Sequence, residues 1–410
     1  MPKGESSYFG FAKETTYGTE TGPNTFWKVI SCAMNWGRDM QRRFRIGGSP
    51  QSSEVLQRAW NQSGSIQMEA DPEAMGVLLE GLFGTSTVTA LPEKPVLGAT
   101  TTLAVGATAG DTTITVSDAT GFAVDDYIAI DTGSACEFAK ITSISGDDLT
   151  IEASGASNGL LFDHDIGDSV EENETPAYKH IFDTTSALPS YTWELDLGSP
   201  DGVSAARFSG MTASSLTLGY EAMEPVMANV SFTGSKMSIH NTTATPTYDE
   251  LGALYTRDTA IEFDGTDKTS IVKSMRVSIT NGLEGAERTI ESGVFATQGS
   301  AGGVAASFDA EALFDSDVDL QRFLGGSGTD YDVAQTTLPF GCTITTDGDY
   351  IGTSETNKYS LKLIMPNVYM TNCSVPVEVG RRIAQSWKAM AVFDDVEGHA
   401  LQIELVNGTR

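Results

Sequence analysis

The sequence predicts a chain dominated by β-strands, in which one domain occurs twice and a small all-β module is inserted into the first copy. Short runs of alternating or β-branched residues recur along the chain, whereas helical signals are few and short. The order of the predicted elements is also the same in the two halves. A chain of 410 residues is long enough for two or three domains.

The strongest strand signals are runs that alternate in polarity or favour extended backbone. They are Val29–Trp36, Tyr191–Leu197, Ser214–Leu218, Met227–Phe232, Ser274–Ile279 and Tyr359–Ile364. A helix is predicted over Asp71–Gly84, with Asp as N-cap, Pro in the first turn and Gly beyond the end. A second short helix is predicted over Asp315–Gly325.

The internal repeat depends mainly on element order. Each half reads as a strand, a long polar hairpin, a strand, a short helix and a strand group that ends in an aromatic residue. A gapless alignment of Phe208–Gly234 with Tyr369–Asp395 pairs Leu216 with Val377. Earlier in the two halves, Cys32, Met34 and Trp36 pair with Met275, Val277 and Ile279.

The two predicted copies differ by an insertion. Four short strand-like pieces lie within it: Thr113–Val116, Tyr127–Ile130, Phe138–Ile144 and Leu149–Glu152. Insertions are tolerated best in surface loops, so we expect a small β-module there. A polar linker, Ser238–Thr247, separates the copies. The expected domains are 1–95 with 176–240, the acidic module 96–175, the linker 241–250, and a second domain 251–410.

Composition excludes several classes of function. The net charge is −30, and Val96–Glu174 holds fifteen Asp and Glu residues against one basic residue, Lys140. Such a surface repels nucleic-acid phosphates and anionic membranes. The four cysteines form no CxxC pair, which favours reduced core thiols and synthesis in a reducing cytosol. The N-terminus lacks a signal-peptide core, and no apolar run is long enough to span a bilayer.

The motifs that could carry chemistry have simpler explanations. Gly155–Gly159 matches the G-x-S-x-G elbow around Ser157, but its Thr/Ser/Gly-rich surroundings favour a turn. Asp315–Asp319 begins like a calcium loop but has Leu320 where glycine is required, so acids at a helix N-terminus explain it better. Asp163, His164 and Asp165 are adjacent and cannot all face one ion, which favours a solvated turn. We therefore expect no enzyme activity and no catalytic, cofactor-binding or metal-binding residues.

One cationic cluster stands out in this acidic chain. It lies in the predicted hairpin Gly37–Asn61, and the matching loop Asn281–Gly303 carries one arginine among three glutamates. The cluster is either a solvated hairpin tip or a prong that docks on an acidic neighbouring copy and fixes the register between subunits. The candidate contact residues between stacked subunits are Arg38, Arg42, Arg43, Arg45 and Arg288.

Two segments resemble the phage tail tube proteins. The opening Ser7–Thr19 contains the run Lys-Glu-Thr-Thr-Tyr-Gly-Thr, and Gly64–Asp71 forms a strand that leads into a short Leu-rich helix. The resemblance covers both copies but not the insertion. It implies a β-sandwich or open β-barrel flanked by one helix, in rings of six domains stacked around a DNA channel. Some long-tailed phages in that family use duplicated subunits of this kind. The inserted module resembles the small domains that tube proteins carry on their outer surface.

A two-domain chain would supply a ring of six domains as a trimer with pseudo-six-fold symmetry. The expected partners are then other copies of the chain, the tape measure protein, and the tail terminator and tip proteins. Viral DNA would pass without specific binding, and the chain would reside in the virion tail. Two alternatives remain: an adhesin or carbohydrate-binding β-protein, which would gather exposed aromatics in one loop group, and a secreted hydrolase, which would need a catalytic triad.

Overall fold

The structure, a computed structural model, describes residues 7–44, 46, 54–153, 158–182, 187–198, 205–248, 252–284, 287–290, 292–324, 338–377, 379 and 382–410. The chain forms two compact units. Unit 1 comprises Met1–Thr85, Phe182–Thr345 and Leu363–Gln402, and unit 2 comprises Ser86–Ile181, Thr346–Lys362 and Ile403–Arg410. Strands dominate both units, as the sequence predicts.

The elements of the first half and of the insertion are β1 (Phe9–Lys13), β2 (Thr25–Trp27), β3 (Ser31–Arg43), β4 (Glu54–Glu69), α1 (Pro72–Phe83), β5 (Ser86–Ala90), β6 (Thr100–Thr102), β7 (Thr113–Thr115), β8 (Tyr127–Ile130), η2 (Gly133–Ala135), β9 (Glu137–Ser145), β10 (Asp148–Ala153), β11 (Ser169–Asn173), β12 (Tyr178–Phe182), β13 (Tyr191–Asp196), β14 (Ala205–Glu221), β15 (Met227–Gly234) and β16 (Lys236–His240). The second half contains η4 (Thr256–Asp258), β17 (Thr259–Phe263), β18 (Thr266–Asp267), β19 (Val272–Thr280), β20 (Ala305–Leu313), α2 (Val318–Leu324), β21 (Phe340–Tyr350), β22 (Lys358–Ser374), β23 (Ala384–Ala391) and β24 (Gln402–Asn407).

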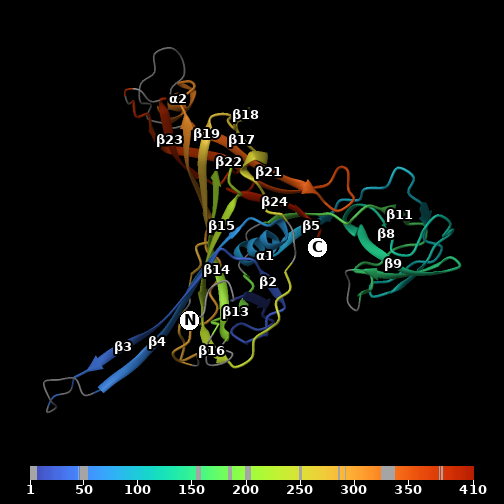
Figure 1. Cartoon of the computed structure of the whole chain (residues 1–410), viewed down its shortest axis with the longest axis horizontal. Coiled ribbons are helices and arrows are strands. Elements are labelled where there is room, and N and C mark those ends of the chain that lie inside the picture. Colours follow the sequence, from blue (N-terminus) through green and yellow to red (C-terminus); the bar gives the residue numbers. More distant parts are fainter. Residues whose placement is uncertain are drawn as a thin grey trace. The chain divides into compact units, whose positions relative to one another are not determined.

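A continuous antiparallel run of strands forms the centre of unit 1 (Figure 1). Its order is β3-β4-β15-β14-β19-β20-β23-β22. The two halves of the sequence meet at β14 and β19, where Ser215–Glu221 pairs with Ser274–Thr280. The first four strands therefore come from the first half of the chain and the last four from the second half.

The two faces of this run differ sharply in polarity. Leu218, Val277 and Trp387 are buried on one face. Their neighbours along the strands are mostly short and polar, such as Thr217 and Ser278, and they are half-buried or exposed on the other face. Successive side chains of a strand point to opposite faces, so the alternation in sequence produces one apolar face and one polar face.

The helix α1 begins and ends as the sequence predicts. The Asp71 carboxylate accepts hydrogen bonds from the backbone N–H groups of Glu73 at 2.9 Å and Ala74 at 3.3 Å. Gly84 follows the helix with a φ of 89°, a conformation that favours glycine. The helix packs on β14, and a Cβ at Gly81 would lie 3.2 Å from the Tyr191 ring. Glycine thus permits close packing of the helix.

The two halves of the run share a β-bulge at corresponding places. Ser214 in β14 and Thr371 in β22 are both skipped by the register to the neighbouring strand. Each donates its hydroxyl to a backbone oxygen of that strand, at 3.1 Å in both cases. The bulges thus pair Ser214 with Thr371, so the gapless pairing of Leu216 with Val377 is wrong in register. Val377 lies beyond the end of β22.

The remaining ladders extend this correspondence across the run. Cys32 lies opposite Ile66, which is in turn opposite Val230. In the second half, Met275 lies opposite Ala310 and then Trp387. Counted from the bulges, Cys32 and Met275 therefore occupy equivalent positions, as the sequence comparison paired them.

The N-terminal segment is held by a buried carboxylate from the Lys-Glu-Thr-Thr-Tyr-Gly-Thr run. Glu14 is 8% exposed. Its Oε1 accepts hydrogen bonds from Thr192 Oγ1 and Gly210 N–H, both at 2.8 Å. Its Oε2 accepts from Gly18 N–H at 2.8 Å and Ser190 Oγ at 2.7 Å. One side chain thus ties the segment that follows β1 to β13 and β14.

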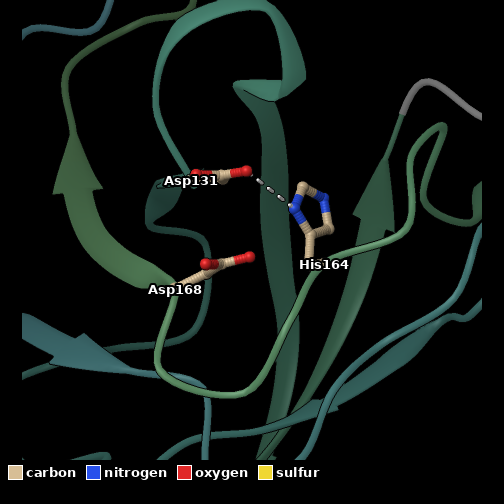
Figure 2. A group of neighbouring side chains, drawn as sticks. All are labelled: Asp131, His164 and Asp168. Carbon is tan, nitrogen blue, oxygen red and sulfur yellow. Dashed lines mark ion pairs between the residues drawn. The ribbon is translucent and has the colours of Figure 1, made fainter.

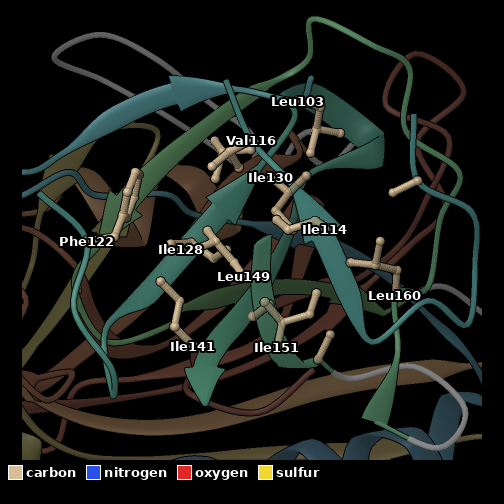
Figure 3. Close-up of a cluster of buried hydrophobic side chains, with 14 of the residues drawn as sticks. Leu103, Ile114, Val116, Phe122, Ile128, Ile130, Ile141, Leu149, Ile151 and Leu160 are labelled. Carbon is tan, nitrogen blue, oxygen red and sulfur yellow. The ribbon is translucent and has the colours of Figure 1, made fainter. Parts of the chain in front are cut away.

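Within unit 2, the insertion forms a six-stranded sheet of order β6-β11-β8-β9-β10-β7. Figure 3 shows its core, which includes Ile128, Ile130 and Leu149. The four predicted strands are confirmed as β7 to β10. Sequence patterns missed β6 and β11, because Thr-Thr-Thr and Ser-Val-Glu-Glu-Asn are short and largely polar.

The expected linker is partly a strand. Its first residues, Ser238–His240, belong to β16, which pairs with β14 so that His240 lies opposite Ala205. The alternation of polar and apolar residues there is too short to distinguish from loop sequence. Residues 241–248 have no helix or strand.

Candidate assembly interface

The hairpin of β3 and β4 continues past the rest of unit 1 as an arm (Figure 1). We define the arm as the described residues of Gly37–Asn61. From Gly37 to Arg43 every residue of β3 is exposed, although Arg43 still pairs with Glu54. A strand pair exposed on both faces buries little of its own, and long unsupported hairpins are marginal in water. The arm is thus the part of unit 1 best placed to contact another molecule.

One face of the arm combines arginines with apolar side chains. Residues opposite each other in a ladder share a face, and Arg38 lies opposite Trp60 while Arg42 lies opposite Val55. The Arg38 guanidinium sits 5.0 Å from the centre of the Trp60 ring. Met40, between the two arginines on this face, is 51% exposed. Arg43 projects from the other face, and Arg45 lies outside the described residues.

Arg288 has a different position from the other candidate arginines. It donates hydrogen bonds to the backbone oxygen of Trp60 at 2.8 Å and to Asn61 Oδ1 at 2.6 Å. It also donates to the Val294 oxygen at 3.2 Å, and that oxygen accepts from Trp60 N–H at 2.9 Å. These contacts attach the loop of the second half to the base of the arm. The structure therefore separates Arg288, at the base, from Arg38, Arg42 and Arg43 along the arm.

The ends of the central run offer strand edges. β3 pairs with β4 along its length and ends the run on one side. On the other side, Asn372–Ser374 pairs with Lys388–Ser386 of β23. Asn372 and Ser374 are exposed and Cys373 is half-buried. An exposed strand edge presents backbone donors and acceptors that another chain can pair with.

The rejected chemical motifs have structural roles where they are described. Ser157 lies outside the described residues. Asp319 lies in the first turn of α2, as the sequence predicts. It is buried there and contacts Lys268 at 2.9 Å and Arg322 at 3.1 Å. The four cysteines are unpaired. Burial raises the pKa of Cys32 to about 12 and, with the charge of Asp131, that of Cys136 to about 11, so these thiols are protonated at neutral pH.

His164 is buried and not on a solvated turn, which corrects the sequence-based expectation. Its ligand atoms are within 4.8 Å of those of Asp131 and Asp168 (Figure 2). Asp163 and Asp165, its neighbours in sequence, are exposed. Desolvation lowers the pKa of His164, but the Glu137 hydrogen bond and the charges of Glu137, Asp131 and Asp168 raise it by more, leaving it raised.

A family model described as phage tail tube protein matches residues 4–367. Among curated proteins none matches, and in the described part of the chain no helix is long and apolar enough to cross a membrane. The family match gives no support to the adhesin alternative. Because the match spans most of the 410 residues and β-strands dominate the described fold, the chain belongs to the phage tail tube protein family and is a structural component of a phage tail.

Proposed function

We propose that this chain is the major tube subunit, that three copies close into a ring of six tube domains, and that stacked rings form the channel through which DNA leaves the capsid. The pairing of β14 with β19 carries this proposal, because it joins two sets of four strands that follow one another in the same spatial order. A heterologous contact that repeats by rotation generates a ring when the rotation closes.

The duplication of the tube domain is supported by residue-level correspondences. β3, β4, β15 and β14 in the first set match β19, β20, β23 and β22 in the second. A helix follows β4 and another follows β20. The bulged residues Ser214 and Thr371 match in position and in hydrogen bonding. In this proposal, 1–95 with 176–240 and 251–410 are the two tube domains, and 96–175 is an inserted module.

The internal joint then predicts the joint between chains. β22 corresponds to β14 and β3 corresponds to β19, so β22 of one chain should pair with β3 of the next. Within the chain, Leu216 lies opposite Ile279. Counting from the bulges, the equivalent of Leu216 is Cys373 and the equivalent of Ile279 is Trp36. We therefore expect Cys373 of one chain to lie opposite Trp36 of its neighbour.

A disulfide experiment tests this register. Opposite residues in an antiparallel pair have Cβ atoms about 4.5–5.5 Å apart, close to the separation that a disulfide spans. Assembled tubes of Trp36→Cys should yield covalent species up to the trimer after mild oxidation, and the additional change Cys373→Ser should abolish them. Asn35→Cys is the matched control, because Asn35 points to the opposite face of the same strand.

The results separate the possibilities. Covalent trimers specific to Trp36→Cys support both the ring and its register. Tubes that form normally but show no more crosslinking in Trp36→Cys than in Asn35→Cys would contradict the proposed joint. Negative-stain images of rings or rods test assembly itself, independently of the register.

The polar face of the central run suits the wall of a DNA channel. Most of its side chains near the joint are short and uncharged, including Thr217 and Ser278, but the exposed Arg276 lies there opposite Gly219. Some of the other charges on this face are paired, such as Lys388 with Asp309 at 3.2 Å. In unit 1, α1 packs against β14. We assign the polar face of the central run to the lumen. A wall of short polar groups and paired charges offers DNA phosphates few cationic partners.

The arm is our candidate for the contact between rings. Arg38, Arg42 and Met40 on its apolar and cationic face would dock on an acidic surface of a copy in the adjacent ring. Opposite charges fix the register of such a contact, while the apolar side chains supply buried area. Arg288 would hold the arm in place from its base instead of contacting the next ring. Contacts with the tape measure, terminator and tip proteins, and synthesis in the host cytoplasm, belong to the same proposal.

A further inference from the structure

The inserted module contains a buried group of side chains that the tube function does not use. Figure 2 shows His164 directed toward Asp131, with Asp168 beside them. The ligand atoms of the three residues all lie within 4.8 Å of one another. The His164 side chain is fully buried, and its Nδ1 has no hydrogen-bond partner among the described residues. A buried ring nitrogen without a partner, beside two carboxylates, needs an explanation.

The contact between Glu137 and Nε2 determines which ring nitrogen of His164 carries a proton. Glu137 is buried, and its Oε1 lies 2.9 Å from His164 Nε2. The same carboxylate accepts hydrogen bonds from the backbone N–H groups of Leu161 at 2.9 Å and Phe162 at 3.0 Å. It is therefore held as an acceptor, which places a proton on Nε2. In the neutral ring, Nδ1 then presents a lone pair to Asp131 and Asp168.

A lone pair directed at carboxylates is unfavourable unless a cation lies between them. A proton on Nδ1 would be one such cation, but Nδ1 lies 3.7 Å from Asp131 Oδ2, which is too long for a hydrogen bond. Two ligands that each lie about 2.0–2.2 Å from one zinc ion, in tetrahedral geometry, are about 3.4 Å apart. The 3.7 Å separation between His164 Nδ1 and Asp131 Oδ2 is close to that value.

We propose that Asp131, His164 and Asp168 bind one divalent transition-metal ion, with Glu137 orienting the histidine. Neutral imidazole is a good ligand for zinc, copper, iron and nickel, whereas calcium and magnesium prefer oxygen ligands. In such sites, the histidine that binds the metal usually donates a hydrogen bond from its other ring nitrogen to a carboxylate or a similar acceptor. The three protein ligands leave a fourth position for water.

The backbone already holds the three ligands in place. His164 exchanges two backbone hydrogen bonds with Ala107, at 2.8 and 2.9 Å. Asp131, with a φ of 61°, donates its N–H to the Ser169 oxygen at 2.8 Å. Asp168 Oδ2 accepts from Asp165 N–H at 2.7 Å. A bound ion would link the end of β8 to the loop that precedes β11 and so clamp the module.

The test uses the full-length chain after removal of metal with a chelator. Co²⁺ and Zn²⁺ are titrated separately, with visible absorption of bound Co²⁺ and calorimetry for Zn²⁺. The variants Asp131→Asn and Asp168→Asn each remove one ligand charge while keeping the side-chain shape. Asp165→Asn is the matched control, because it removes the same charge from an exposed position nearby.

The wild type and Asp165→Asn should each bind one ion per chain, with ligand-field bands for Co²⁺. Asp131→Asn and Asp168→Asn should bind at least about tenfold more weakly. Two substitutions on different loops keep the test valid if one of them fails to fold. Absence of saturable binding, or equal binding by wild type and both ligand variants, would overturn the proposal. The cluster would then be an imidazolium ion held by carboxylates.

Discussion

Glu14 allows a sharp test of how the N-terminal segment is fixed. Its carboxylate accepts four hydrogen bonds inside unit 1, two from backbone N–H groups and two from hydroxyls. Lys13, the residue before it, forms an ion pair with Glu80 at 2.6 Å, in which the Lys13 side chain is 56% exposed. The two neighbours thus offer a buried and an exposed interaction for direct comparison.

The expected magnitudes follow from burial. A hydrogen bond to a charged group contributes about 1.5–3 kcal/mol. The four bonds of Glu14 are not additive, because water can enter the space left by alanine. We therefore expect Glu14→Ala to lower the free energy of unfolding by about 3–5 kcal/mol. Lys13→Ala should cost under about 1 kcal/mol, as for other exposed ion pairs.

Glu14→Gln refines the prediction, because glutamine keeps the shape but replaces one oxygen with an NH₂ group. Oε1 accepts from Gly210 N–H and Oε2 accepts from Gly18 N–H. Whichever way the amide is turned, one backbone N–H faces a donor and loses its acceptor. One buried, unsatisfied donor costs about 1–3 kcal/mol, so this variant should lie between the other two.

Urea denaturation followed by tryptophan fluorescence provides the measurement. All five tryptophans of the chain lie within the ranges of unit 1, so the signal reports that unit. The expected order of stability is Lys13→Ala, then Glu14→Gln, then Glu14→Ala. If Glu14→Ala were no less stable than Lys13→Ala, the buried carboxylate would not be what secures the segment.

Three further predictions concern the arginine cluster, the base of the arm and the inserted module. Replacing Arg42, Arg43 and Arg45 together by serine should block rod formation while leaving the subunit folded. Wild-type polymerisation should also weaken in high salt. Full-length rods from that variant, with unchanged salt response in light scattering, would identify a solvated tip. Arg288→Ala should increase amide hydrogen exchange at the base of the arm, and unchanged exchange there would contradict a bracing role. Deleting Val96–Glu174 should leave a chain that still forms tubes by electron microscopy, with a lower melting temperature; an insoluble or purely monomeric product would place the module in the assembly core.

The lower melting temperature has a specific structural cause. Ala129, Cys136 and Phe138 of the insertion pack with Ala90 and Tyr178, which flank it. The deletion therefore uncovers apolar surface on the residues that remain. A sequence-based boundary cannot reveal this, because the contact is between residues far apart in the chain and none of them forms a recognisable motif.

Local signals predicted the elements whose causes are local. α1 was predicted from its N-cap Asp71, from Pro72 and from the terminal Gly84, because capping acts within a few residues. The bulges at Ser214 and Thr371 were not predicted, because a bulge is defined only by the partner strand. The pairing of Leu216 with Val377 is four residues away from the pairing with Cys373 that the bulges give.

The residues around His164 likewise include one neighbour that local sequence could have suggested and two that only the fold brings close. Asp168 follows His164 by four residues across Gly167, which has a φ of 95°, so a turn could have suggested their proximity. Asp131 and Glu137 reach the group from opposite ends of the β8–β9 turn and meet His164 only in the folded sheet. Asp163 and Asp165 could not join His164 at one ion, since adjacent residues in extended backbone point to opposite sides, so the sequence alone favoured a solvated turn.

The difference between the two halves has a consequence for stacking. β3 continues to Arg43 as a paired strand, whereas its counterpart β19 ends at Thr280 and is followed by a loop with an isolated bridge between Glu284 and Ser300. That loop braces the arm through Arg288. In the proposed ring of three chains, the six domains would be alike along the wall but would carry only three arms. Adjacent rings could then engage only at rotations that satisfy three-fold symmetry. In this proposal, a duplicated chain would restrict the register of stacking more strongly than six identical domains would.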